Sequence, residues 1–477
     1  MRTQRTVKWL TLTGAVAASL LLAACAVGPD YKAPATQLAA FHNAPAVGRR
    51  DVQLERWWAA FNDPILLQLV DTALAQNLDL AASIARVSQA RATASAAGAQ
   101  LLPAVDASTQ ASAYRQSLVG PIGSIARNFP GYDRDQRVYD VGAAASWEID
   151  LFGGLRRGSE AARAEAQAAE ADRLGVRVSV AADVADAYFR VRSDQARLIV
   201  TQQQIDVESH LVDLVTQRRG HGVSSERELA QTRALLTSAQ AVLPVLRIDL
   251  EAQLNRLDVL LGVQPGTVAK DLVGSRDIAA VPQVPAAGEP AELLRRRPDV
   301  IAAERRVAAA NARIGASLAD YYPKVSLSGV LGFESLSSGN LFNSQAFQPV
   351  GTGAIRWRLF DFGRVRAEVS RARGADAEAL ARYQESVLHA AEDVENAFLS
   401  LQQTEIRTRA LEAEVSELGH ARELSQQAYS AGVIPLTDVL DADRLLLSAR
   451  DDLAQSRADD ARAAVRVYRS LGGGWSS

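Results

Sequence analysis

The chain has 477 residues, of which 48% are apolar and 22% are charged, so it can bury a large apolar surface and is not compositionally disordered. Its formal net charge of -3 provides no broad basic surface for a polyphosphate, and no Walker, zinc-knuckle or RNP-like motif is present. We therefore expect no nucleic-acid partner.

Residues 1–24 have the pattern of a secretory signal, which predicts that the chain is exported. Basic residues within the first eight positions precede a mostly apolar run, residues 9–24, that is too short to span a bilayer. The run ends in Leu-Ala-Ala before Cys25, which resembles the bacterial lipobox, where the cysteine thiol is acylated and the signal is cut just before it. Cleavage at this site predicts Cys25 as the first mature residue. Cys25 is also the only cysteine, so no intrachain disulfide can form. Ala26 resembles the outer-membrane sorting pattern. The alternative is an ordinary signal peptide with a chance cysteine.

The remainder of the chain contains an internal duplication. Residues 101–108 are matched by residues 321–328, an offset of 220. Three later landmarks share an offset of 210: Trp147 to Gly153 and Trp357 to Gly363, Gly222-Val223 and Gly432-Val433, and Leu261-Gly262 and Leu471-Gly472. The difference in offset falls between Pro323 and Trp357, and a length change confined to one interval is typical of a loop on a fixed scaffold.

Each copy begins with a predicted helix, residues 64–99 and residues 298–320, in which apolar residues recur at spacings of three and four. Two runs with apolar residues at every second position follow, and these predict strands. The apolar positions of the four predicted strands are Val105, Ala107, Thr109, Ala111 and Ala113; Val141, Ala143, Ala145, Trp147, Ile149 and Leu151; Val325, Leu327, Leu331 and Phe333; and Ile355, Trp357 and Leu359. Each run is near the ~9–11 residues with which a tilted strand crosses a bilayer, although a soluble hairpin has the same pattern.

Long helical stretches follow each strand pair, residues 153–222 and residues 363–432, and the two are equal in length from glycine to glycine. At ~1.5 Å per residue each spans on the order of 100 Å, which is typical of a coiled-coil strut. A return helix of about 37 residues then covers only ~55 Å. The helix that enters each strand pair would supply most of the other half, giving four full-length staves per chain.

These landmarks divide the chain into six predicted parts. They are a signal peptide at 1–24, a lipidated N-terminal segment at 25–62 that wraps the outside, a first repeat at 63–262, a proline-rich linker at 263–290, a second repeat at 291–472 and a C-terminal tail at 473–477. Four strands cannot close around a lumen, and lipid tolerates no open sheet edge because unpaired amides and carbonyls find no water there. The chain must therefore oligomerise, and two, three or four copies all satisfy this requirement.

Motifs spread over nearly the whole mature chain carry a family resemblance. They are Cys25 with Val27 to Tyr31, Arg296 to Val300 with Ala302 to Glu304, Asp361 to Arg364, Tyr429 to Val433, and Leu440 to Ala442 with Arg444. In combination they resemble the outer membrane factor family, the TolC-like exit ducts of tripartite pumps, and in particular its NodT-type efflux lipoprotein branch.

The resemblance implies a mainly α-helical fold with a membrane β-barrel portion. A homotrimer would form a 12-stranded β-barrel continuous with a long periplasmic α-helical barrel, located in the outer membrane and extending into the periplasm. Its implied partners are outer-membrane lipid, a periplasmic membrane-fusion adaptor protein and an inner-membrane pump of the resistance-nodulation-division type. The duct would do no chemistry, because the pump supplies the energy. No cofactor is implied besides the N-acyl and S-diacylglycerol lipid on Cys25.

Two short glycine-marked turns reverse the long helices. By resemblance, the adaptor contacts them at Gly222, Val223, Ser224, Gly432, Val433, Ile434 and Pro435. The charges just past the second turn have diverged from the first copy, and they form the predicted periplasmic gate: Asp438, Asp441, Asp443 and Arg444. Asp441 and Arg444 occupy places that in relatives help close the entrance, and three symmetry-related Asp441 carboxylates would form a ring. The other interpretation is an i,i+3 ion pair on a solvated helix face.

No enzymatic or metal site is expected. The five histidines lack metal-ligand spacing and nothing resembles a nucleophile elbow. Two other functions stay open, an exit duct for type I protein secretion and a periplasmic lipid-anchored coiled-coil scaffold or adaptor that does not cross the membrane. The sequence does not identify the cargo, because the transporter selects it.

Overall fold

The computed structural model describes residues 26–476, except for 36–37, 45–53, 271, 273, 275–277 and 285–294. The predicted signal peptide and Cys25 lie outside the described residues. The chain divides into two compact units. The first comprises Ser88–Ala168 and Glu304–Arg382 with the N-terminal residues up to Pro34, and the second comprises Ala35–Val87, Ala169–Ala303 and Tyr383–Ser477.

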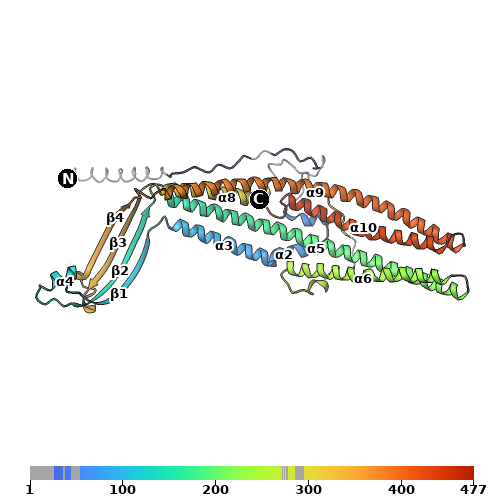
Figure 1. The fold of residues 1–477 in the computed structure, drawn as a ribbon, viewed down its shortest axis with the longest axis horizontal. Helices are drawn as coiled ribbons and strands as arrows, with labels where there is room; N and C mark the ends of the chain where they lie inside the picture. The colour runs from blue at the N-terminus through green and yellow to red at the C-terminus, as the bar shows by residue number, and fades with distance from the viewer. Residues whose placement is uncertain are drawn as a thin grey trace, which may run out of the picture. The chain divides into compact units, whose positions relative to one another are not determined.

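Two successive copies of one set of elements are visible along the chain (Figure 1). In the first copy, α2 (Pro64–Gln76) and α3 (Leu78–Ala99) precede β1 (Ala104–Arg115), β2 (Asp135–Ile149), α5 (Gly154–Gly220) and α6 (Glu226–Leu260). In the second copy, α8 (Pro298–Ala319) precedes β3 (Lys324–Ser335), β4 (Phe347–Arg356), α9 (Arg364–Ser430) and α10 (Leu436–Ser470). The shorter elements are η1 (Leu54–Phe61), α4 (Pro121–Ala126), η2 (Val268–Lys270), η3 (Ser338–Asn340) and η4 (Ser344–Ala346).

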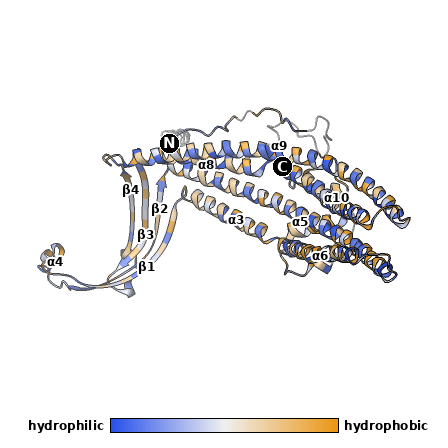
Figure 2. Ribbon diagram, turned by 45° about the vertical axis from the view of Figure 1, so that its right-hand side comes forward, coloured by the Kyte–Doolittle hydropathy of each residue, from blue (hydrophilic) through white to orange (hydrophobic). Residues whose placement is uncertain are grey.

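The predicted equality of the helices is confirmed, because α5 and α9 both have 67 residues and α6 and α10 both have 35. No helix among the described residues is both long and apolar enough to cross a bilayer. Figure 2 accordingly shows hydrophilic residues along every long helix.

The predicted single helix over residues 64–99 is wrong, because the chain breaks at Asn77 into α2 and α3. Asn77 ends α2, and its side-chain oxygen accepts a hydrogen bond of 2.9 Å from the backbone amide of Leu80 at the start of α3. Its side-chain amide donates to the carbonyl of Leu260, the last residue of α6, at 2.8 Å. The break therefore also satisfies a carbonyl at the end of the returning helix.

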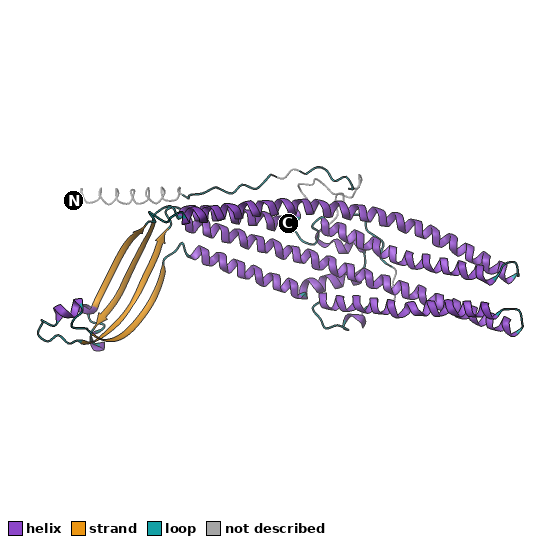
Figure 3. Cartoon of the chain, viewed as in Figure 1, coloured by secondary structure: helices purple, strands orange, loops and turns teal. Residues whose placement is uncertain are grey.

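The first unit contains a four-stranded antiparallel sheet in the order β1-β2-β3-β4 (Figure 3). The predicted apolar positions share one face, since Val105 lies opposite Ala145, Trp147 opposite Leu327 and Val325 opposite Ile355. Within the described part of the chain, the outer edges of β1 and β4 have no strand beside them.

The sheet corrects the prediction for the fourth strand. β4 ends at Arg356, opposite the first residue of β3, so Trp357 and Leu359 lie beyond it. The corresponding residues of the first copy, Trp147 and Ile149, extend past the end of β1 but are paired with β3 on their other side. Trp357 and Leu359 have no strand on that side, which explains why the ladder stops. The prediction also placed Leu151 in the second strand. β2 ends instead at Ile149, which is the last of its residues that pairs with β3, so Leu151 lies beyond the strand.

The second unit is organised around a buried aromatic and aliphatic core and a buried arginine. Trp57 of η1 is 1% exposed and stacks on Tyr468 of α10, with ring centroids 5.3 Å apart. Arg297, just before α8, donates hydrogen bonds to the carbonyls of Ala390 and Ser470 at 3.3 and 3.2 Å. It also pairs with Asp393 at 2.8 Å, and so joins the start of α8 to α9 and to the end of α10.

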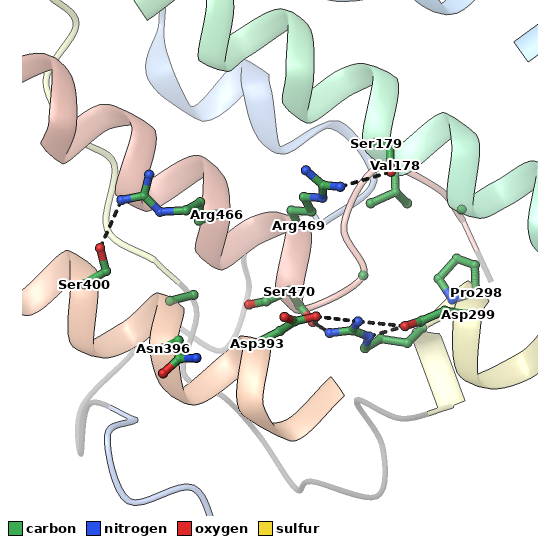
Figure 4. A pocket seen from close by; sticks show the side chains of 14 residues that line it. Val178, Ser179, Pro298, Asp299, Asp393, Asn396, Ser400, Arg466, Arg469 and Ser470 are labelled. Atoms are coloured by element: carbon green, nitrogen blue, oxygen red, sulfur yellow. Dashed lines mark hydrogen bonds and ion pairs between the residues drawn. The ribbon is translucent and has the colours of Figure 1, made fainter. Parts of the chain in front are cut away.

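A cavity of about 650 Å³ lies next to this arginine. Figure 4 shows Asp299, Asp393 and Ser470 lining it from α8, α9 and α10, with Ser179 contributed by α5. Asp299 is the second carboxylate partner of Arg297, at 2.7 Å. The Arg-Arg-Pro-Asp motif of the sequence therefore supplies a junction between helices rather than an isolated surface pair.

We expect Arg297→Ala to destabilise the second unit by about 2–4 kcal/mol, because two carbonyls and two carboxylates lose a buried guanidinium partner. Arg297→Lys should recover only part of this, since an ammonium cannot bridge the same four groups. The measurement is the temperature at which detergent-solubilised protein loses its helical circular dichroism. Arg295→Ala, at a neighbouring exposed arginine, is the control, and equal midpoints for Arg297→Ala and this control would contradict the prediction.

Candidate functional site

The two predicted helical turns have the same backbone geometry. In the first, the amide of Val223 donates to the carbonyl of Arg218 and that of Gly222 to Arg219, both at 2.9 Å. In the second, Val433 donates to Ala428 and Gly432 to Tyr429, also at 2.9 Å. Both pairs of bonds form the Schellman motif, which needs a left-handed residue, and Gly222 and Gly432 have φ of 73° and 74°. The glycines are therefore required by the helix ends, whatever else the turns bind.

The helix that leaves each turn begins differently in the two copies. Ser225 caps α6 and forms a reciprocal capping box with Glu228, with bonds of 3.2 and 2.7 Å. Pro435 precedes α10 and provides no side-chain hydrogen bond. Ser224 and Ile434 are half-buried, whereas Val223 and Val433 are 65% and 74% exposed. Each turn therefore presents one exposed apolar side chain at its end.

An apolar cluster beneath the turns joins the two helix pairs within the second unit. It contains Leu211, Val215, Leu229, Tyr429, Leu436, Val439 and Leu440. The guanidinium of Arg218 on α5 lies 4.7 Å from the ring centroid of Tyr429 on α9. The turns are thus held by packing between helices that belong to different copies of the repeat.

Three of the four predicted gate residues share an exposed surface of α10. Asp438, Asp441 and Arg444 are all exposed, and the Asp441 and Arg444 side chains approach to 3.7 Å. With exposed fractions of 72% and 65%, this pair contributes roughly 0–1 kcal/mol on its own. Burial therefore holds neither side chain in place.

Asp443 is placed apart from these three. It is 4% exposed, and its Oδ1 atom accepts a hydrogen bond of 2.8 Å from Nε of Arg422 on α9. Its other carboxylate oxygen is buried and has no hydrogen-bond partner among the described residues. Asp443 therefore belongs to the contact between α9 and α10.

Glu208 of α5 is a functional candidate that the sequence did not reveal. It is 2% exposed, and its Oε1 atom accepts a hydrogen bond of 2.6 Å from Gln204. Burial and the nearby Asp443 carboxylate raise the pKa of Glu208, while Gln204 and Arg422 oppose this shift. The two buried carboxylates, Glu208 on α5 and Asp443 on α10, therefore lie near the same arginine, Arg422. No sequence pattern connects positions 208 and 443, because only the packing of the two helix pairs brings them together.

The residues that follow Cys25 are fixed in the first unit. The amide of Val27 donates to the carbonyl of Phe152, just after β2, at 3.0 Å. Gly28 has φ of 105°, and a methyl group there would lie 2.5 Å from Cα of Gly315 on α8. Asp30 pairs with the buried Arg157 at 2.6 Å. The Val-Gly-Pro-Asp motif thus docks where β2 passes into α5.

Comparison with known proteins decides the family. The protein family described as Outer membrane efflux protein matches residues 69–263 and 290–473, which together are most of the chain. The chain belongs to the outer membrane efflux protein family. It is an outer-membrane efflux channel protein, and it is located in the outer membrane and extends into the periplasm.

Similar proteins are alike over nearly their full length. The pyoverdine export outer membrane protein OpmQ of Pseudomonas putida is 34% identical over 423 residues, which cover 89% of each chain. The toluene efflux pump outer membrane protein TtgI of Pseudomonas putida is 32% identical, over 96% of this chain and 97% of its own. The solved structure of the outer-membrane channel OprN matches with a TM-score of 0.87 and 35% identity, over 94% of this chain and all of that one. The names of these relatives describe outer-membrane proteins of export and efflux and an outer-membrane channel, and none of them describes an enzyme.

We expect Glu208→Gln to stabilise the helices near the turns at neutral pH. A carboxyl whose pKa is raised on folding, here from 4.5, lowers stability as pH rises through the interval between its unfolded and folded values. The amide keeps a carbonyl acceptor for Gln204 and removes the charge. Hydrogen exchange over residues 204–212 and 440–446 should slow severalfold at about pH 7.5, and the difference should shrink towards about pH 4.

The matched control is Asp206→Asn, at an exposed carboxylate two residues away. It should leave exchange in both segments nearly unchanged at either pH. Faster exchange in Glu208→Gln at neutral pH would show that the charged form of Glu208 stabilises the turns, contrary to the prediction.

Proposed function

We propose that this protein is the exit duct of a tripartite efflux system. Three copies would form a channel that passively passes substrates from an inner-membrane pump and a periplasmic adaptor to the outside. The pump would be of the resistance-nodulation-division type. The observation that carries the proposal is the sheet with two open edges, β1 and β4, in a protein of the outer membrane.

Open edges in lipid require closure by other copies of the chain. Unpaired amides and carbonyls have no water to bond in the bilayer core, so a spanning sheet must close on itself. Three subunits of four strands give a 12-stranded barrel, an even number within the range of bacterial outer-membrane barrels. The same three copies would bring together twelve helical staves as a periplasmic barrel, with α5 and α9 as the continuous ones.

The exposed charges after the second turn support a gate. Asp438, Asp441 and Arg444 lie on one exposed surface, so three-fold symmetry would place three copies of each around the axis. Asp443 would act indirectly, by holding α10 to α9 through Arg422. The turn residues 222–224 and 432–435 would contact the adaptor, with Val223 and Val433 as its apolar contacts.

Relatives favour small molecules over proteins as cargo. OpmQ is named for pyoverdine export and TtgI for toluene efflux, which supports an efflux duct over a type I secretion duct. A periplasmic scaffold has no need of a four-stranded sheet with an apolar face and is the less favoured alternative.

A lipid on Cys25 is consistent with how the next residues dock. Val27 is hydrogen-bonded beside the end of β2, so acyl chains on Cys25 would enter the membrane next to the strands. We propose N-acyl and S-diacylglycerol groups, including palmitate, as the covalent lipid.

Removing the charges at the second turn should open the channel. We expect Asp441→Ala with Arg444→Ser to raise the single-channel conductance of reconstituted protein severalfold, because the ring of charges between subunits is lost. The control removes another exposed ion pair, Glu378 and Arg382 on α9, whose atoms are 2.6 Å apart. A closed state unchanged from the native protein would eliminate the gate assigned to Asp441 and Arg444.

Cys25→Ser should abolish metabolic labelling with radioactive palmitate, because no other thiol is present to carry the lipid. Ala26→Ser, which leaves the cysteine in place, should be labelled as the native protein is. Undiminished labelling of Cys25→Ser would refute the lipid assignment but would leave the duct function standing.

A further inference from the structure

A second cavity, of about 260 Å³, lies among the helices of the second unit. Its lining includes Asp194 of α5, Asp249 of α6 and Asp459 of α10. None of these residues belongs to the turns or to the predicted gate. Helices from both copies of the repeat therefore border a polar space that the proposed exit duct does not account for.

Asp194 is a buried carboxylate without a partner. It is 8% exposed, and it forms no hydrogen bond or ion pair with any described residue. Burial raises the pKa of Asp194 to about 6, and Asp249 adds to this shift while Arg197 opposes it. Buried polar groups in native proteins nearly always have a hydrogen-bond partner. The Asp194 carboxylate therefore leaves a place for a hydrogen-bond donor that the described residues do not supply.

A second buried acceptor lines the same cavity. The side-chain oxygen Oε1 of Gln253 on α6 is buried and has no hydrogen-bond partner among the described residues. A buried acceptor that is left without a donor costs the free energy of its lost hydration. The cavity thus presents two unpartnered acceptors, one of them a carboxylate, on α5 and α6.

The arginines beside the cavity do not neutralise Asp194. Among the described residues, three arginines line the cavity, and each is hydrogen-bonded to a carboxylate other than Asp194 or Asp249. The pairs are Arg190 with Asp186 at 2.9 Å, Arg197 with Asp451 at 2.8 Å, and Arg462 with Asp186 and Asp459 at 2.7 Å. Asp249 is exposed and forms no ion pair with a described residue. The carboxylates of Asp194 and Asp249 are therefore uncompensated, and their charge favours a cationic ligand.

The side chains present favour an ammonium group over a metal ion. In the part of the chain that the structure describes, no group of three or more His, Cys, Asp or Glu side chains is placed to hold a metal ion. An ammonium group needs no such coordination shell, because it carries three N–H donors that can bind separate acceptors. The cavity of about 260 Å³ also has room for an alkyl chain, since a water molecule takes only about 30 Å³ of liquid volume.

We propose that this cavity binds a small organic cation with primary ammonium groups, such as a short alkyl diamine. One ammonium group donates to the Asp194 carboxylate and to Oε1 of Gln253, and the exposed Asp249 accepts the other. The ligand supplies the donors and the positive charge that this part of the helix contact lacks. The site is formed within one chain, so it does not depend on the proposed trimer.

Equilibrium dialysis of the full-length protein in detergent against radiolabelled 1,4-diaminobutane tests the proposal. We expect saturable binding at about pH 7.5. Asp194→Asn should weaken this binding by at least about tenfold, because a charge-assisted hydrogen bond is lost. Gln253→Met, which has a similar volume but no amide oxygen, should weaken it severalfold. Asp213→Asn, at an exposed carboxylate of α5 outside the cavity, is the matched control and should bind as the native protein does.

The pH dependence gives a second readout with a sign set by Asp194. The Asp194 carboxylate is charged above about pH 6 and protonated below it, whereas the diamine stays charged throughout. The affinity of the native protein should therefore fall by about tenfold between about pH 7.5 and pH 5, and that of Asp194→Asn should change much less. The charged and neutral groups around Asp194 that could shift this midpoint are Arg190 and Arg197 on α5, Asp249 and Gln253 on α6, and Asp451, Asp459 and Arg462 on α10.

Three results would overturn the proposal. Equal affinities of the native protein and Asp194→Asn would show that the diamine binds elsewhere. Displacement of the diamine by magnesium chloride, where sodium chloride at the same ionic strength has no effect, would show a metal site. The absence of saturable binding would show that water alone fills the cavity. Asp194→Asn should fold normally, because it removes an uncompensated buried charge, and its helical circular dichroism checks this.

Discussion

The backbone hydrogen-bonding groups along the outer edges of β1 and β4 impose the constraint on which the rest of this structure depends. In lipid each must find a partner, and the chain itself supplies none beyond the four-stranded sheet in its described part. In the proposed duct, every copy of the repeat would therefore pair with the next copy, either within the chain or between chains. Strand register and helix length would have to be the same at each of these contacts, whereas the loops at the far end of the strands could change length. The equal helices and the loop of altered length both follow.

The helical part is held by a different balance of forces. Its long helices carry polar residues throughout, so apolar packing is confined to clusters such as those around Trp57 and around Val215. Buried charges such as Arg297 join helices as well, here α8 to α9 and to the end of α10. Such pairs are strongly destabilising to break even where their net contribution to stability is small. The Arg422–Asp443 contact near the turns belongs to the same class. Glu208 is a second buried carboxylate near it, and burial together with Asp443 raises its pKa.

Sequence reasoning reached the regular features and missed those that depend on neighbours. The lengths of α5 and α9 were predictable because glycines mark both ends, and a helix turn of the Schellman type needs a left-handed residue there. The break at Asn77 was not predictable, because the Asn77 side-chain amide donates a hydrogen bond to the carbonyl of Leu260, which is far away in the sequence. The end of β4 was not predictable either, because it depends on where the neighbouring strand β3 begins. Asp443 was grouped with Asp441 by proximity in sequence, although positions two apart on a helix face different sides.

The sequence by itself determined the duplication, the alternation of strands with long helices and, through its motifs, the family, because these are properties of local pattern and of spacing. Tertiary structure alone decided which side of α10 is buried, which carboxylates share Arg422, and where the residues after Cys25 dock. Those outcomes arise from contacts between segments that are distant in the chain, and one-dimensional spacing does not encode them. The duplication is visible both in the sequence and in the structure, because the same offsets relate the matching residues and the strand pairs of the sheet.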